Sequence, residues 1–139
     1  TLQITRSRFQ LFEGRDLTPE EEAQYTRMQA NHGETLDHCG RLFKAGVKLM
    51  AGSDCGWGVY PFGHFDRELL ALVNAGLTPT QAIVAGTSNN AELLGIGDII
   101  GTVEAGKSAD LLVVEGNPSV NITDIANVTA VFKAGTRTR

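Results

Sequence analysis

The chain has 139 residues, of which 42% are apolar and 20% are charged, as is typical of a single soluble globular domain. A formal net charge of −4 argues against a nucleic-acid partner, and no apolar run is long enough to span a membrane. Two cysteines, Cys39 and Cys55, are too few for a disulfide framework, so we expect a reducing, cytoplasmic setting. Because the chain starts at Thr1 rather than at methionine, we expect further residues to precede it.

Capping signals mark the helices of the first half. Thr18 followed by Pro19 and two glutamates predicts a helix start, and this helix should run from about Pro19 towards Ala30. Asn31-His32-Gly33 is expected to interrupt it, and a second helical stretch should continue to about Lys44.

The apolar run Val47–Ala51 predicts a short strand that is buried on both faces of a parallel sheet. Two further helices are predicted at Phe65–Ala75 and Pro79–Ala85. From residue 98 the pattern changes to short β-rich runs between glycines, and the predicted strands are Ile99–Val103, Leu111–Val114 and Val128–Lys133. A lone parallel strand leaves its backbone groups unpaired, so the chain looks like the end of something larger.

The candidate site residues follow the strand predicted at Val47–Ala51. Asp54 lies where α/β barrels carry catalytic groups, although an aspartate here could equally cap a turn or accept bonds from loop amides. Trp57 and Tyr60 could form a wall of a binding site or fold down onto the core. His64 could contact substrate or carry a proton, or it could face solvent beside a helix start.

Metal binding elsewhere in the chain finds little support. His32, His38 and Cys39 do not have the spacing of three or four residues that two ligands on one helix face require. The sequence contains no His-x-His pair. A charge such as that of Asp54 at the end of a buried strand is costly unless it is paired or bound to a metal.

Two stretches in combination carry a family resemblance. "AGVKLMAGSD" and "FDRELLALVNAGLTPTQAIVAGTSNNAELLGIGDIIGTVEAGKSADLLVVEGNP" together resemble the C-terminal part of metal-dependent amidohydrolases. The similarity is greatest to the branch of imidazolonepropionase-like and Xaa-Pro-dipeptidase-like enzymes. It implies an α/β fold in which residues 1–97 form the C-terminal segment of a (β/α)8 TIM barrel, with its last strand and helices. Residues 98–139 would supply strands to a small β-sandwich built from both chain ends.

The resemblance also implies a chemistry. Asp54 matches the aspartate after the eighth barrel strand, which touches the metal centre and takes a proton from the metal-bound water that attacks an amide carbonyl. Trp57, Tyr60 and His64 would line the substrate side of the barrel mouth. The implied cofactor is a divalent metal, with zinc expected, and the implied substrate is a small molecule or dipeptide with an amide or cyclic-amide C–N bond.

Two hypotheses follow from what the chain lacks. A catalytic zinc usually has about three protein ligands, and in the family the others come from earlier strands. The chain is therefore expected to be an inactive fragment of a hydrolase that needs the remainder of the barrel. The alternative is a non-catalytic module that binds a partner chain or forms a homo-oligomer through unpaired strand edges.

Overall fold

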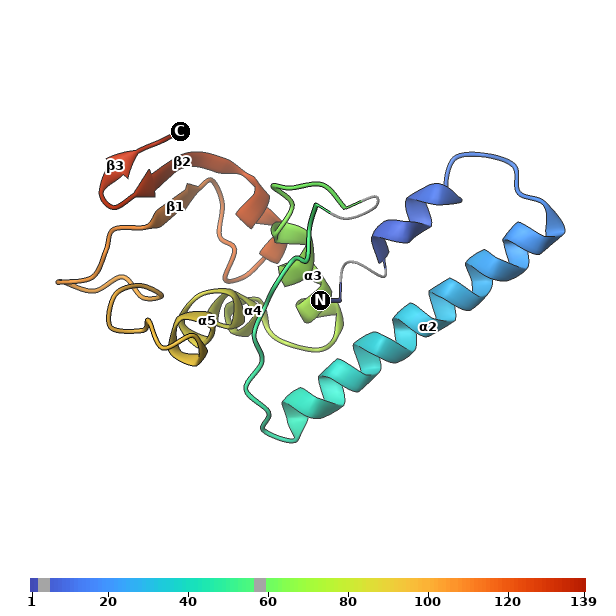
Figure 1. Cartoon of the computed structure of the whole chain (residues 1–139), viewed down its shortest axis with the longest axis horizontal. Coiled ribbons are helices and arrows are strands. Elements are labelled where there is room, and N and C mark those ends of the chain that lie inside the picture. The colour runs from blue at the N-terminus through green and yellow to red at the C-terminus, as the bar shows by residue number, and fades with distance from the viewer. Residues whose placement is uncertain (3–5, 57–59) are drawn as a thin grey trace.

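Helices make up the first part of the molecule and a small sheet makes up the last part (Figure 1). The fold is that of a computed structural model, which describes residues 1–2, 6–56 and 60–139. The elements in chain order are η1 (Arg8–Leu11), α2 (Pro19–Lys44), α3 (Asp66–Asn74), α4 (Pro79–Gly86), α5 (Ser88–Leu93), β1 (Leu111–Val114), η2 (Ile122–Ala126), β2 (Val128–Lys133) and β3 (Thr136–Arg137). The division of the chain at residue 97 stays a prediction.

The longest element, α2, begins as the sequence predicts. The Thr18 hydroxyl accepts a hydrogen bond from the Glu21 amide, and the Glu21 carboxylate accepts one from the Thr18 amide, which is a complete capping box. The predicted interruption at Asn31-His32-Gly33 is wrong, because the helix continues without a break for 26 residues. One glycine costs a helix only about 1 kcal/mol, and the His32 ring packs edge-on against Phe9 of η1 at 5.6 Å between centroids.

The strand predicted at Val47–Ala51 is not part of a sheet in the described structure. Side-chain amides of α5 take the place of a neighbouring strand. Asn90 donates to the Ala51 carbonyl at 2.8 Å and accepts from the Ala51 amide at 3.1 Å, and Asn89 donates to the Leu49 carbonyl at 3.0 Å. A parallel ladder requires a second strand alongside, and the described residues provide none.

The sheet at the C-terminal end has three antiparallel strands in the order β1-β2-β3. Leu111 pairs with Phe132, and a bulge falls between Val113 and Val114. Two of the predicted strands, β1 and β2, are confirmed with the expected bounds. The hairpin between β2 and β3 closes through a two-residue turn, Ala134-Gly135, in which both residues have positive φ.

The strand predicted at Ile99–Val103 is wrong, because this segment forms turns. The amides of Ile99 and Ile100 both donate to the Ile96 carbonyl, at 3.0 and 3.2 Å. Gly101 follows with φ of 102°, and a Cβ there would lie 2.5 Å from that of Ala91. Local hydrogen bonds and contact with α5 therefore hold the segment back from the sheet.

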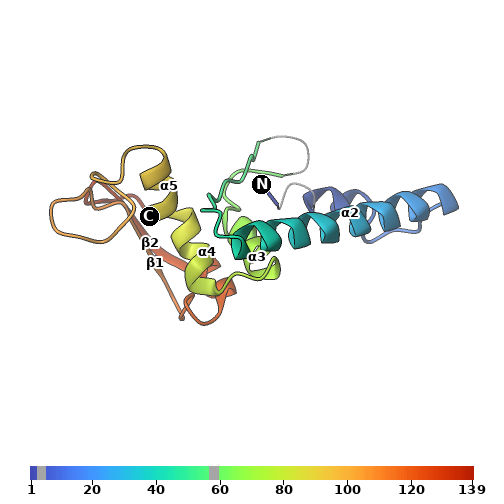
Figure 2. The same ribbon diagram turned by 90° about the horizontal axis from the view of Figure 1, so that it is seen from below.

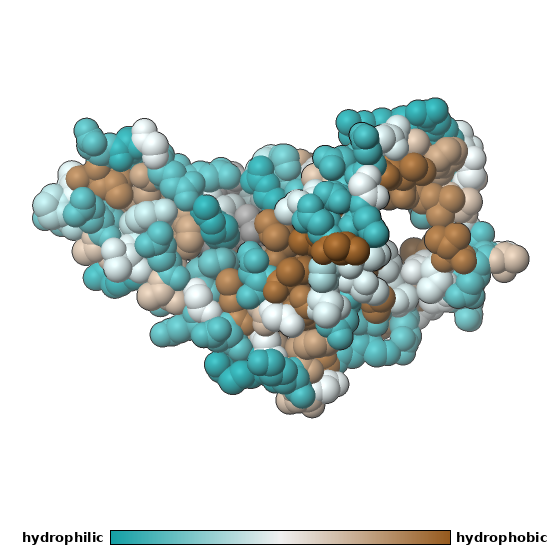
Figure 3. Space-filling model, turned by 180° about the vertical axis from the view of Figure 1, so that it is seen from behind, coloured by the Kyte–Doolittle hydropathy of each residue, from teal (hydrophilic) through white to brown (hydrophobic). Residues whose placement is uncertain are grey.

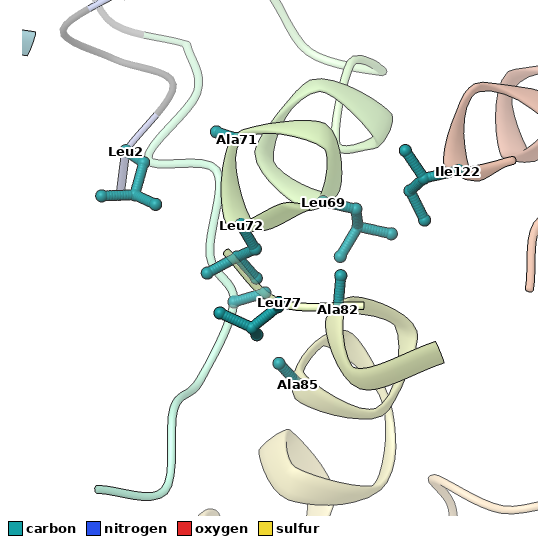
Figure 4. Packing of buried hydrophobic residues seen from close by; sticks show 9 residues of the cluster. Leu2, Leu69, Ala71, Leu72, Leu77, Ala82, Ala85 and Ile122 are labelled. Atoms are coloured by element: carbon teal, nitrogen blue, oxygen red, sulfur yellow. The ribbon is translucent and has the colours of Figure 1, made fainter. Parts of the chain in front are cut away.

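The core lies where α3 and α4 pack together, between α2 on one side and the sheet on the other (Figure 2). Figure 4 shows that Leu69 of α3 faces Ala82 of α4 and Ile122 of η2. The small side chains of α4 allow the two helices to approach closely. Leu2 and Ala51 belong to the same cluster, so residues far apart in the chain meet beside α3. Among the described residues, no helix combines the length and apolarity that crossing a membrane requires.

Candidate functional site

Asp54 lies on an exposed loop that leaves the core at Ala51. Its backbone has φ of 49°, in the left-handed region that few residues other than glycine adopt. Aspartate tolerates this conformation better than most residues, but such a conformation persists only where the surrounding structure holds it. The contacts that fix this loop therefore decide where the Asp54 carboxylate points.

The loop folds back on itself around Tyr60. The Gly56 amide donates to the Tyr60 carbonyl at 2.8 Å, and the Tyr60 hydroxyl donates to the His64 carbonyl at 2.7 Å. Tyr60 is only 1% exposed, whereas Phe62 is 77% exposed. A Cβ at Gly56 would lie 2.6 Å from the Phe62 ring, so this glycine allows the loop to close.

Two acidic residues of α3 shape the electrostatics beneath the loop. Burial, with the nearby charges of Glu68 and Asp66, raises the pKa of Tyr60 to about 12, so its hydroxyl stays a neutral donor. Glu68 is 2% exposed and accepts a hydrogen bond from the Leu2 amide at 2.9 Å. Burial and the charge of Glu68 also raise the pKa of the Cys39 thiol.

The structure places three of the predicted site residues on one loop. The side chain of Asp54 is exposed, and that of His64 is half-buried. Tyr60 lies under the loop with its hydroxyl bonded, so its role as a substrate contact stays a prediction. Trp57 lies outside the described residues. Asp54, Tyr60 and His64 thus share a loop, but Tyr60 faces inward.

Sequence reasoning missed Glu68. The signal was available, since Glu68 falls on the same helical face as Ala71 and Leu72, which are both buried. A charged residue on the apolar face of a helix needs a buried partner. Its partner here, the Leu2 amide, lies 66 residues away in sequence.

The described residues do not form a complete metal centre. Among them, no three His, Cys, Asp or Glu side chains are grouped closely enough to hold an ion. The exposed carboxylate of Asp54 is a single potential ligand. His32 packs against Phe9, and burial together with the charge of Arg6 lowers the pKa of His32.

A cavity of about 670 Å³ lies between η1, α2 and α3, and Arg6, His32 and Arg67 are among its lining residues. Arg6 pairs with Glu13 at 2.9 Å. Among the described residues of the Asp54 loop, none lines this cavity. The cavity and the Asp54 carboxylate are therefore treated as separate features.

The sheet leaves apolar side chains uncovered. Leu112 and Val113 of β1 are 50% and 44% exposed, and Val103 in the segment before it is 86% exposed. Figure 3 shows apolar surface in several patches, one of them at the sheet end of the molecule. Strand β1 also has one unpaired edge within the described sheet.

The model of the amidohydrolase family matches residues 18–138 of the chain. The chain belongs to the amidohydrolase family. The imidazolonepropionase of Geobacillus kaustophilus is 36% identical over 74 residues, which is 52% of this chain and 18% of that protein. The imidazolonepropionase of Aromatoleum aromaticum is 40% identical over 77 residues, covering 55% of this chain and 19% of that protein.

Solved structures of two other enzymes superpose well on this amidohydrolase chain. A Xaa-Pro dipeptidase with methionine bound in its active site gives a TM-score of 0.77 at 28% identity, covering 99% of this chain and 32% of that one. A molinate hydrolase gives a TM-score of 0.68 at 28% identity, and the match covers 76% of this chain and 26% of that one. The chain spans about a fifth of the length of the curated relatives and about a third or less of these solved chains. The family assignment and its branch, expected from the sequence, are confirmed.

Proposed function

We propose that this chain is the C-terminal part of a metal-dependent amidohydrolase that hydrolyses amide or cyclic-amide C–N bonds of a small molecule or dipeptide. The family match over residues 18–138 and the imidazolonepropionase and Xaa-Pro dipeptidase relatives support this class of reaction. The observation that supports the proposal is that Asp54 has an exposed side chain and a left-handed backbone on the loop that precedes α3. The two free cysteines support a cytoplasmic setting.

Asp54 has two roles in this proposal. A divalent metal, with zinc expected, supplies a water of lowered pKa when it is bound. In the complete site, the Asp54 carboxylate would be one ligand of this metal, and the other ligands would come from the remainder of the barrel. The same carboxylate accepts the proton of the attacking water and returns it to the leaving nitrogen. Trp57 and His64 are the proposed substrate contacts, and Tyr60, whose side chain is buried, is proposed to support the substrate side of the loop.

The test is Asp54→Asn in the full-length protein, with hydrolysis of Xaa-Pro dipeptides and of imidazolonepropionate as the assay. Removal of a general base lowers kcat by about 10²- to 10⁴-fold, and we expect a loss in that range. Asp98→Asn is the matched control, because Asp98 is also exposed and lies outside the loop. Full turnover by the Asp54 variant would refute the assignment.

A second candidate function is a non-catalytic module that binds a partner chain or a second copy of itself. The exposed apolar residues Leu112, Val113 and Val103 favour it, together with the free edge of β1. Sedimentation and metal analysis of the 139-residue chain distinguish the two functions. A monomer that hydrolyses substrate with stoichiometric metal would exclude the module.

A further inference from the structure

We infer that Glu68 and Tyr60 are positioning residues that hold the Asp54 loop in the conformation its chemistry requires. This inference rests on the proposed function, since it assigns a role towards Asp54 to two buried residues outside the reacting groups. Both side chains are almost fully buried, at 2% and 1% exposure. Because both are buried, we expect neither to contact substrate directly.

Glu68 ties the start of the described chain to α3. A buried carboxylate is costly unless it is hydrogen-bonded, and Glu68 accepts a charge-assisted bond from the Leu2 amide at 2.9 Å. Leu2 and Ala51 belong to one core cluster, and the Thr1 side chain lies 3.7 Å from where a Cβ of Gly52 would be. Glu68 therefore joins α3 to the start of the described chain, beside the point where the Asp54 loop leaves the core.

Tyr60 fixes the far side of the loop. Its carbonyl accepts the bond from Gly56, two residues after Asp54, and its hydroxyl donates to His64, two residues before α3 begins. One buried residue thus connects the backbone next to Asp54 with the start of α3.

The consequence concerns the direction of the Asp54 carboxylate. A left-handed φ is unfavourable for any residue with a Cβ, so Asp54 returns to negative φ once these ties are weakened. A rotation at this residue redirects its side chain, and a misplacement of about 1 Å can cost about 10²-fold in rate. Loss of either tie should therefore impair the chemical step more than substrate binding.

The experiment compares Tyr60→Phe, Glu68→Gln and Glu68→Ala in the full-length protein. We expect Tyr60→Phe and Glu68→Ala to lower kcat about 10-fold or more while KM stays within about twofold. Glu68→Gln should retain more activity than Glu68→Ala, because its amide oxygen can still accept from Leu2. Amide hydrogen exchange of residues 53–56 should accelerate in the impaired variants.

Tyr25→Phe and Glu115→Gln are the matched controls. The Tyr25 hydroxyl donates to Glu13 on the surface, and Glu115 is an exposed residue after β1. Both should keep the parent kcat and the parent exchange of the loop. If Glu68→Ala fails to fold, Tyr60→Phe still decides, since phenylalanine keeps the original side-chain shape and removes only the hydroxyl.

The outcomes separate this inference from the proposed function. Unchanged kcat in Tyr60→Phe and Glu68→Ala, with an inactive Asp54→Asn, overturns the positioning role and leaves the proposed function standing. Lowered kcat without faster exchange of residues 53–56 also overturns it. An active Asp54→Asn overturns both.

Discussion

Two glycines of α2 should respond to alanine in opposite directions. In an open helix interior, Gly→Ala stabilises by about 1 kcal/mol because the unfolded chain loses freedom. At Gly33, nothing lies within 4 Å of the new Cβ, so Gly33→Ala should raise stability by about that amount. At Gly40, the new Cβ would lie 2.3 Å from the carbonyl oxygen of Ala75, the residue that caps α3.

The cost at Gly40 follows from this contact. Real contacts of this kind do not fall below 3.0 Å, so the two atoms must separate by about 0.7 Å, and the obstacle is backbone rather than a flexible side chain. Overpacking costs about 1–3 kcal/mol, and a rigid obstacle belongs at the upper end. After the gain of about 1 kcal/mol in helix propensity, Gly40→Ala should destabilise the chain by about 2 kcal/mol.

Urea unfolding of the chain, followed by circular dichroism, measures both effects. With an m-value of about 2 kcal/mol/M, Gly40→Ala should lower the midpoint by about 1 M and Gly33→Ala should raise it by about 0.5 M. The wild-type chain and the two variants should share one m-value. A Gly40→Ala midpoint at or above the wild-type value would refute the reasoning, since it would mean that α2 does not approach α3 this closely.

Three further predictions concern other parts of the chain. Arg15 and the Thr18 amide lower the pKa of Glu21 to about 2. The ionised Glu21 carboxylate therefore stabilises the folded chain above about pH 4.5, and this contribution is lost as the pH falls towards 2. The urea midpoints of the wild type and Glu21→Gln should therefore converge over that range, and a constant difference would contradict the ion pair. Asn90→Ala removes two hydrogen bonds to Ala51 and should lower the free energy of unfolding by about 2 kcal/mol. Asn89→Ala removes one hydrogen bond, to Leu49, and should lower it by about 1 kcal/mol. Equal urea midpoints for the two variants would contradict this. Ala134→Asn should raise the thermal midpoint by several degrees, because the first residue of its turn has φ of 47° and asparagine adopts that conformation more readily; a lower midpoint would contradict the turn.

Local chemistry made several elements predictable. The start of α2 follows from a threonine cap and a proline, and α4 repeats the device with Thr78 and Gln81. Strands β1 and β2 follow from β-branched residues between glycine and asparagine. These signals act over a few residues and need no distant partner.

The errors in predicted structure arise where a distant partner decides. Val47–Ala51 has the composition of a buried strand, but a strand exists only beside another strand, and asparagine side chains of α5 take its hydrogen bonds instead. Ile99–Val103 has β-rich composition, but turns at Ile96 and contact with α5 hold it. Glycine has a low helix propensity, so an interruption was predicted at Gly33. The helix nevertheless continues through this residue.

The sequence by itself determined the amidohydrolase family, the helix starts, two strands and the position of Asp54 after an apolar run. Only the tertiary structure decided that Asp54 adopts a left-handed backbone, that Tyr60 faces inward and that Glu68 reaches Leu2. The physical reason is the distance along the chain over which each interaction acts. Caps, turns and apolar periodicity act between residues a few positions apart, whereas a buried carboxylate is stabilised by a partner that only the folded chain brings within 3 Å.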